Sequence, residues 1–182
     1  MQKHKMVKEI LYTQEFLEEK ILECSKWVNE TYKYADDLVL VALLKGSIPF
    51  LAQLIKTVEV DHSLDFIIAS SYAGSHATSG SVKIIMDLAQ DVQGKDVLIV
   101  EDIIDSGITL EKIKIFCLAE SSKSLRILTL MDKPYHRKND LKPDYSGFEV
   151  EDKFLIGFGH LDYNEKLRNL PYIGVMDEKY IK

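Results

Sequence analysis

Three acids, two hydroxyls and a glycine follow one apolar run in the middle of the chain. Residues 97–100 (Val-Leu-Ile-Val) are followed by Glu101 and Asp102 and then by two isoleucines. A five-residue segment comes next: Asp105, Ser106, Gly107, Ile108 and Thr109. The apolar run predicts a buried strand, and the apolar pattern of residues 110–118 predicts a helix. The polar groups therefore lie in the turn between a strand and a helix.

Segment 105–109 has the groups that bind a phosphate. Backbone N–H groups and the positive end of a helix attract anions, a glycine allows close approach, and hydroxyls add donors. Glu101 and Asp102 would repel a phosphate, but they suit the hydroxyls of a ribose or a magnesium ion. Together these groups predict a site for a ribose 5-phosphate. The alternative is that Asp105 and Ser106 only cap the helix and that the acids face solvent.

Apolar strands alternate with helices along the chain. Strands are predicted at residues 38–44, 64–69, 97–100, 125–130, 154–158 and 172–176, with an antiparallel return at 82–86. Helices are predicted at residues 49–55 and 110–118, and a longer helix follows Thr13, its predicted N-cap. This alternation predicts an α/β fold with a mostly parallel sheet that helices cover on both faces.

The predicted sheet also indicates where a ligand should bind. In open parallel sheets, ligands occupy the crevice beyond the carboxyl ends of the strands. We therefore expect the site directly after four positions, which are Leu44, Ala69, Val100 and Leu130.

Length and composition limit the classes of function. The 182 residues fit a single domain, 1–182, and no repeat or flexible linker divides them. The net charge of -6 argues against nucleic acid as a partner. No apolar run is long enough for a membrane span and no signal peptide is recognised, so a cytoplasmic protein without a membrane partner is expected. Cys24 and Cys117 lie in apolar helical patterns, which favours reduced core cysteines over a disulfide.

Residues 97–109 resemble the signature of the type I phosphoribosyltransferases, and residues 38–175 resemble the hypoxanthine-guanine branch of that family. The Walker loop and the dinucleotide fingerprint do not occur in the chain. The resemblance implies a central, mostly parallel, twisted sheet flanked by helices, with a small hood formed by the terminal regions. It implies a purine salvage reaction in which 5-phosphoribosyl-1-pyrophosphate and a 6-oxopurine give IMP or GMP and pyrophosphate, with Mg²⁺ as the cofactor. Family members are commonly homodimers or homotetramers.

The resemblance also implies roles for the residues that follow the predicted strands 97–100 and 38–44. Glu101 and Asp102 would hold the ribose hydroxyls and one metal ion, and Asp105 would accept the N7 proton of the purine as the general base. Lys45 and Gly46 resemble the pyrophosphate loop of the family, in which the peptide bond between these two residues is often cis. A plain turn between a strand and a helix is the alternative for that loop.

Two further segments resemble parts of the family's site. Ser71 and Tyr72 resemble its mobile catalytic loop, which excludes water from a reactive transition state; an ordinary hairpin loop is the alternative. Lys133 resembles the lysine that donates to O6 of the purine, where adenine presents an amino group instead. A solvated surface lysine is the alternative at this position.

The C-terminal quarter carries the remaining resemblance. Phe154 would stack on the purine while the backbone of Leu155 bonds its edge, and a core phenylalanine is the alternative. Asp162 would bind a second metal ion near the base, and Arg168 would bind pyrophosphate. Between Phe154 and Asp162 the chain is one residue longer than the usual family spacing, and we place the extra residue near 159–160.

Two other functions stay open on the sequence. A regulator that senses a ribose phosphate would need segment 105–109, but it would not need Lys133, Phe154 and Asp162 together. A transferase for another base, xanthine or a pyrimidine, is the second. Lys133 and Asp162 argue against a pyrimidine, whereas xanthine shares the 6-oxo group.

Overall fold

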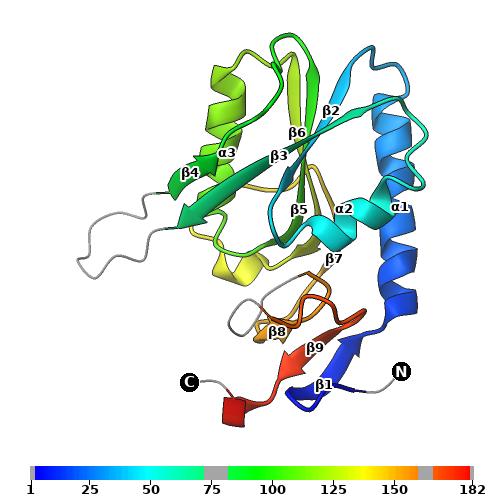
Figure 1. The fold of residues 1–182 in the computed structure, drawn as a ribbon, viewed down its shortest axis with the longest axis vertical. Helices are drawn as coiled ribbons and strands as arrows, with labels where there is room; N and C mark the ends of the chain where they lie inside the picture. The colour runs from blue at the N-terminus through cyan, green and yellow to red at the C-terminus, as the bar shows by residue number, and fades with distance from the viewer. Residues whose placement is uncertain (1–2, 72–81, 160–165, 181–182) are drawn as a thin grey trace.

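The computed structural model describes residues 3–71, 82–159 and 166–180 of the chain. The predicted α/β fold is confirmed. A six-stranded sheet with helices on both faces forms the larger part of the molecule, and a three-stranded sheet lies beyond one end of it (Figure 1).

The larger sheet has the strand order β4-β3-β2-β5-β6-β7. Its strands are β2 (Leu38–Leu43), β3 (Ser63–Ser71), β4 (Val82–Met86), β5 (Asp96–Ile104), β6 (Ser124–Asp132) and β7 (Tyr145–Glu149). β4 runs antiparallel to β3, as predicted, and the other pairs are parallel. All six residues of β2 are buried, which explains why this strand has a continuous apolar sequence.

Three helices cover the sheet. Helix α1 (Gln14–Tyr32) and helix α2 (Ile48–Leu54) pack on one face, and α3 (Ile108–Ala119) packs on the other (Figure 1). Thr13 is the N-cap of α1, as predicted, and its hydroxyl accepts a hydrogen bond from the backbone N–H of Phe16 at 3.3 Å. Within the described residues, the structure contains no helix with the length and apolar character of a membrane span.

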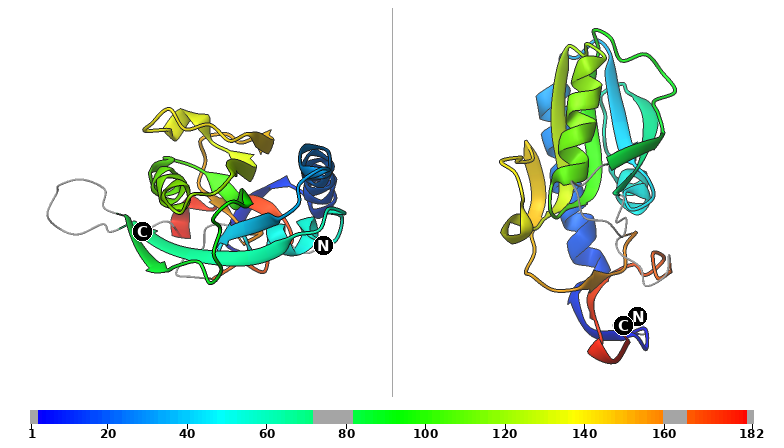
Figure 2. Two further views of the ribbon diagram at one scale, coloured as in Figure 1. Left: turned by 90° about the horizontal axis from the view of Figure 1, so that it is seen from above. Right: turned by 90° about the vertical axis from the view of Figure 1, so that its left-hand side faces the viewer.

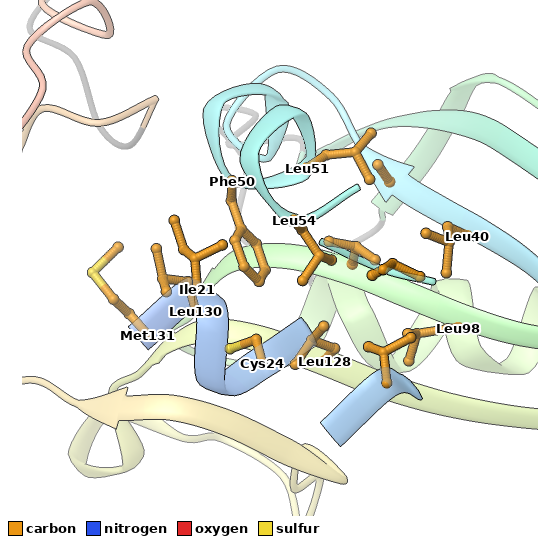
Figure 3. Close-up of a cluster of buried hydrophobic side chains, with 14 of the residues drawn as sticks. Ile21, Cys24, Leu40, Phe50, Leu51, Leu54, Leu98, Leu128, Leu130 and Met131 are labelled. Carbon is orange, nitrogen blue, oxygen red and sulfur yellow. The ribbon is translucent and has the colours of Figure 1, made fainter. Parts of the chain in front are cut away.

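The two faces of the sheet carry separate hydrophobic cores. Alternate strand residues such as Leu40 and Leu98 pack with Phe50 and Leu54 of α2 (Figure 3). The residues between them, Val39 and Ile99 among others, pack against α3.

The two cysteines lie in different cores. Cys24 belongs to the core under α1 and α2, and Cys117 to the core under α3. Both are free and buried, as predicted. Burial raises the pKa of Cys24 to about 12 and that of Cys117 to about 11, so both stay thiols at neutral pH.

The smaller sheet joins the two ends of the chain. β1 (Val7–Tyr12) pairs antiparallel with β9 (Ile173–Met176), which pairs with β8 (Leu155–Ile156). Figure 2 shows this sheet beyond the end of the larger one, which fits the expected hood. Segments 154–158 and 172–176 were predicted as strands of the alternating series, but they form this separate sheet.

Strands β1 and β7 were not predicted. Both consist mostly of half-exposed or exposed residues, with one buried residue in β1 and none in β7. Neither therefore has the continuous apolar run that identifies the central strands.

Candidate functional site

A cavity of about 200 Å³ opens at the carboxyl ends of β2, β3 and β5. Leu44 and Ala69 line it, so it lies where the geometry of the sheet predicted a ligand site. The lining also includes six of the residues selected from the sequence: Gly46, Glu101, Asp105, Ser106, Gly107 and Thr109. Residues 60 positions apart therefore meet at one place.

The two adjacent acids of β5 face different neighbours. β5 continues to Ile104 instead of ending at Val100, so Glu101 and Asp102 lie within the strand. Glu101 lines the cavity, whereas Asp102 is buried against the loop at Gly46. A Cβ placed on Gly46 would lie 2.6 Å from Oδ2 and 2.7 Å from Oδ1 of Asp102. The loop after β2 thus contacts the carboxylate directly.

Glu101 has the chemistry of a ligand-binding acid. Its Oε2 is buried and has no hydrogen-bond partner among the described residues. Burial, the charge of Asp102 and a hydrogen bond with that residue raise the pKa of the Glu101 carboxyl well above its usual range. A metal ion or a hydroxyl donor would satisfy this oxygen. The part of the chain that the structure describes holds no group of three metal-ligating side chains.

The predicted phosphate loop lies at the start of α3. Gly107 is the N-cap residue, with φ +77°, and Ser106 Oγ accepts from the backbone N–H of Ile108 at 3.5 Å. A Cβ on Gly107 would lie 2.5 Å from Asn139 Oδ1 and 2.7 Å from Arg137 Cδ, so conformation and space both require a glycine. The positive end of α3 therefore opens on the cavity, where an anion is stabilised.

Arg137 holds this loop from behind, and the sequence analysis missed it. Its Nε donates to the backbone carbonyl of Asp105 at 3.1 Å, and its NH2 nitrogen lies 3.5 Å from that of Ile104. It also bonds the Leu141 carbonyl and forms an ion pair with Asp132. A single arginine in a polar stretch carries no local sign of such contacts.

A polar network links the ends of β5 and β6. Lys133 is 10% exposed, so the alternative of a solvated surface lysine is wrong, and its Nζ lies 3.0 Å from Asp152 Oδ1. His136 lies between two carboxylates, with Nε2 2.8 Å from Asp152 Oδ1 and Nδ1 3.3 Å from Asp105 Oδ1. Hydrogen bonds from His136 and Lys133 lower the pKa of Asp152. The sequence analysis gave no role to His136 or Asp152.

Phe154 and Leu155 have different environments. Phe154 is 40% exposed, which contradicts the alternative of a core phenylalanine. It follows Lys153, whose backbone carbonyl lies 3.5 Å from Lys133 Nζ, so the backbone next to Phe154 reaches the Lys133 ammonium. Leu155 is buried in β8, where only its backbone could contact a ligand.

The loop after β2 corrects one expectation. The cis peptide bond joins Leu44 to Lys45, not Lys45 to Gly46. The two bonds are neighbours in one turn, and the residue types alone did not distinguish them. Lys45 itself is exposed.

Arg168 reaches this loop through Gly159. Its NH1 nitrogen donates to the Gly159 carbonyl at 2.5 Å, and the Gly159 N–H donates to the Arg168 carbonyl at 2.9 Å. Gly159, with φ +78°, packs against the carbonyl of Gly46, and a Cβ there would also lie 2.5 Å from Pro49 Cδ. Three predicted pyrophosphate-binding residues, Lys45, Gly46 and Arg168, therefore belong to one neighbourhood.

Four predicted positions lie at or beyond the ends of the described ranges. Ser71 ends β3 at the limit of the described residues. Tyr72 and Asp162 lie outside the described residues, and so does His160, one of the two positions near which the extra residue is expected.

Comparisons with known proteins agree on one family. The family model described as phosphoribosyl transferase domain matches residues 7–163. The chain is 46% identical to the hypoxanthine-guanine phosphoribosyltransferase of Bacillus subtilis (strain 168), over 97% of this chain and 96% of the relative. It is 44% identical to the hypoxanthine phosphoribosyltransferase of Escherichia coli (strain K12), over 91% and 93%.

A solved structure is similar over almost its whole length. The crystal structure of a hypoxanthine phosphoribosyltransferase from Staphylococcus aureus aligns with a TM-score of 0.93 at 40% identity, covering 98% of this chain and 96% of that one. The resemblance found in the sequence is thereby confirmed. The chain belongs to the type I phosphoribosyltransferases, within their hypoxanthine-guanine branch.

Proposed function

We propose that the protein transfers ribose 5-phosphate from 5-phosphoribosyl-1-pyrophosphate to hypoxanthine or guanine, which releases pyrophosphate and forms IMP or GMP. The names of the relatives support this reaction. The observation that carries it in this chain is the meeting of three features at one edge of the sheet: the phosphate loop, the buried Oε2 of Glu101, and the Lys133–Asp152 pair.

The ribose phosphate would bind in the cavity. Segment 105–109 would hold the 5-phosphate with backbone N–H groups and the hydroxyls of Ser106 and Thr109. Glu101 would accept from the ribose hydroxyls, which agrees with its unpartnered buried oxygen. By resemblance, Asp102 would hold the hydroxyls of the same ribose, and it also supports the loop at Gly46.

Magnesium fits the acids of this site. Carboxylate oxygens are the preferred ligands of Mg²⁺, and Glu101 carries a buried oxygen that a cation would satisfy. We propose that Glu101 and Asp102 hold one Mg²⁺, and that Asp162 contributes to a second by resemblance. When bound, the metal neutralises charge on the leaving pyrophosphate.

The purine would lie between the ends of β5 and β6. Asp105 would accept the N7 proton as N9 attacks the anomeric carbon. The Lys133 ammonium would donate to O6, and its burial supports this role because a desolvated donor discriminates strongly against a wrong partner. Phe154 would stack on the ring and the Leu155 backbone would bond its edge.

The leaving pyrophosphate would be held by Lys45, the Gly46 N–H and Arg168. The contacts of Gly159 with both Gly46 and Arg168 support this grouping. By resemblance, Ser71 and Tyr72 would close over the reacting groups.

Three broader proposals accompany the reaction. The contact between Gly159 and the loop at Gly46 supports one functional domain, 1–182, because it joins the hood region to the larger sheet. The resemblance to the family supports a homodimer or homotetramer, which light scattering would test, and a cytoplasmic location.

One assay tests the reaction. Ultraviolet absorbance would follow the consumption of hypoxanthine, guanine, xanthine and adenine with 5-phosphoribosyl-1-pyrophosphate, with and without Mg²⁺. We expect consumption of hypoxanthine or guanine that requires Mg²⁺, and little of adenine. A protein that binds 5-phosphoribosyl-1-pyrophosphate but consumes no base would be a sensor, and the proposal would be wrong.

A further inference from the structure

Asp105 follows β5 and Lys133 follows β6, yet the proposed reaction requires a fixed distance between their side chains. N7 and O6 are neighbouring groups on one edge of guanine. The acceptor of the N7 proton and the donor to O6 must therefore match that edge together. Asp105 lies in the loop after β5, and Lys133 follows β6 directly.

His136 connects these two residues through contacts that run from one to the other. Its Nδ1 lies 3.3 Å from Asp105 Oδ1, and its Nε2 lies 2.8 Å from Asp152 Oδ1. The same oxygen of Asp152 lies 3.0 Å from Lys133 Nζ. The two groups that would act on the purine are thus joined by one imidazole and one carboxylate.

The chemistry of these contacts is directional. Ionised carboxylates only accept hydrogen bonds, so a ring N–H of His136 donates to the carboxylate that it contacts. Such charge-assisted bonds are stronger and better oriented than neutral ones. The lowered pKa of Asp152, caused first by its hydrogen bond with His136 and then by that with Lys133, agrees with this arrangement.

The backbone beneath His136 is held on both sides. His136 ends the short helix Pro134–His136, in which the proline ring fixes one backbone angle. Arg137 follows, and its side chain is 10% exposed and bonds the Asp105 carbonyl. The imidazole therefore extends from a fixed base toward the Asp105 carboxylate.

We propose that His136 is a positioning residue for the transfer reaction. It contacts Oδ1 of Asp105 and so orients the carboxylate, whose other oxygen is left to accept the N7 proton. Through Asp152 it also fixes the Lys133 ammonium for O6. This inference rests on the proposed function, because it assigns a task within that reaction.

Steady-state kinetics of three full-length variants would test it. His136→Phe keeps a ring but removes both contacts, and His136→Gln keeps one donor and one acceptor. Tyr135→Ala is the matched control, because Tyr135 lies in the same short helix and is 76% exposed. The purine and 5-phosphoribosyl-1-pyrophosphate would be varied separately, and the melting temperature would be measured for each variant.

The expected result is a selective loss. In His136→Phe, kcat/KM for hypoxanthine and guanine should fall about tenfold, since misplacement of a catalytic group by a fraction of an ångström has effects of this order. KM for 5-phosphoribosyl-1-pyrophosphate and the melting temperature should stay close to those of the wild type. His136→Gln should recover part of the loss, and Tyr135→Ala should behave as the wild type.

The results that would contradict the inference can be distinguished from the result that would contradict the proposed function. A wild-type protein that consumes no 6-oxopurine would overturn the proposed function and the inference with it. An active wild type with unchanged kinetics in His136→Phe would overturn the inference alone. Equal losses for both substrates, or an equal loss in Tyr135→Ala, would mean that this helix has a general structural role, and the inference would again be wrong.

Discussion

Replacing Gly46 by alanine tests the contact between the loop after β2 and Asp102. The new Cβ would lie 2.6 to 2.8 Å from three atoms of a carboxylate that is 4% exposed. Ordinary contacts are about 3.5 Å, so the loop or the carboxylate must move by roughly 0.8 Å. Crowding of this kind costs about 1–3 kcal/mol. If the loop binds pyrophosphate, the same displacement should lower kcat/KM for 5-phosphoribosyl-1-pyrophosphate by about 10- to 100-fold.

Gly94→Ala is the matched control. Gly94 has φ +72° and nothing lies within 4 Å of its added Cβ, so the substitution strains the backbone without a clash. It lies before β5, at the opposite end of that strand from the cavity. A residue other than glycine in this conformation costs about 1–2 kcal/mol, comparable with the expected cost at Gly46.

Thermal melting and kinetics separate the two effects. Each kcal/mol should lower the melting temperature of a chain of this size by about 2–4 °C, so both variants should melt a few degrees below the wild type. Only Gly46→Ala should lose activity. If it melts earlier but keeps wild-type kinetics, the contact with Asp102 matters for stability alone, and the assignment of this loop to the leaving group loses its support.

Three further substitutions address the acids and the lysine. In metal-free protein, burial and the charge of Asp102 raise the pKa of the Glu101 carboxyl. Protonation of Glu101 therefore stabilises the fold fully below about pH 4.3, the ordinary pKa of a glutamate. This stabilisation is lost as the pH rises through the pKa of Glu101 in the folded state. Glu101→Gln should reduce that loss in melting curves recorded with EDTA across this range, and an unchanged decline would exclude Glu101 as its source. Asp105→Asn should lower turnover by about 10²- to 10⁴-fold while 5-phosphoribosyl-1-pyrophosphate still raises the melting temperature; unchanged turnover would exclude Asp105 as the base. Lys133→Ala should weaken use of hypoxanthine and guanine more than pyrophosphorolysis of nucleotide analogues without O6, and equal losses would remove the O6 contact.

The strands and helices that were predicted from the sequence are those whose own residues form a recognisable apolar pattern. β2 and the first half of β5 are covered on both faces, so each leaves a continuous apolar run. β1 and β7 are mostly half-exposed and leave none. The separate sheet of β1, β8 and β9 pairs the two ends of the chain, and local periodicity does not record pairings between distant segments.

The same distinction applies to the candidate site. Segment 105–109 was predicted as a phosphate loop because its donors, glycine and helix start are consecutive. The bridge from Asp105 through His136 to Asp152 spans 47 residues and exists only after β5, β6 and the turn before β8 are assembled. The position of the cis bond at Leu44 could not be predicted either, because two adjacent peptide bonds in one turn share the same residues.

The hydrogen-bond and ion-pair partners of the acidic side chains at this edge of the sheet indicate which acid is available to bind a ligand. Asp132 is paired with Arg137, and Asp105 contacts His136, so the protein itself supplies a partner to both. Glu101 differs, since its buried Oε2 has no hydrogen-bond partner among the described residues. An unsatisfied buried oxygen costs about 1–3 kcal/mol, and such a cost in a folded protein calls for an explanation such as a bound ion or ligand. A ligand that bonds to this oxygen removes that free-energy cost. Glu101 is therefore where a bound substrate or metal ion should add most to the stability of the fold.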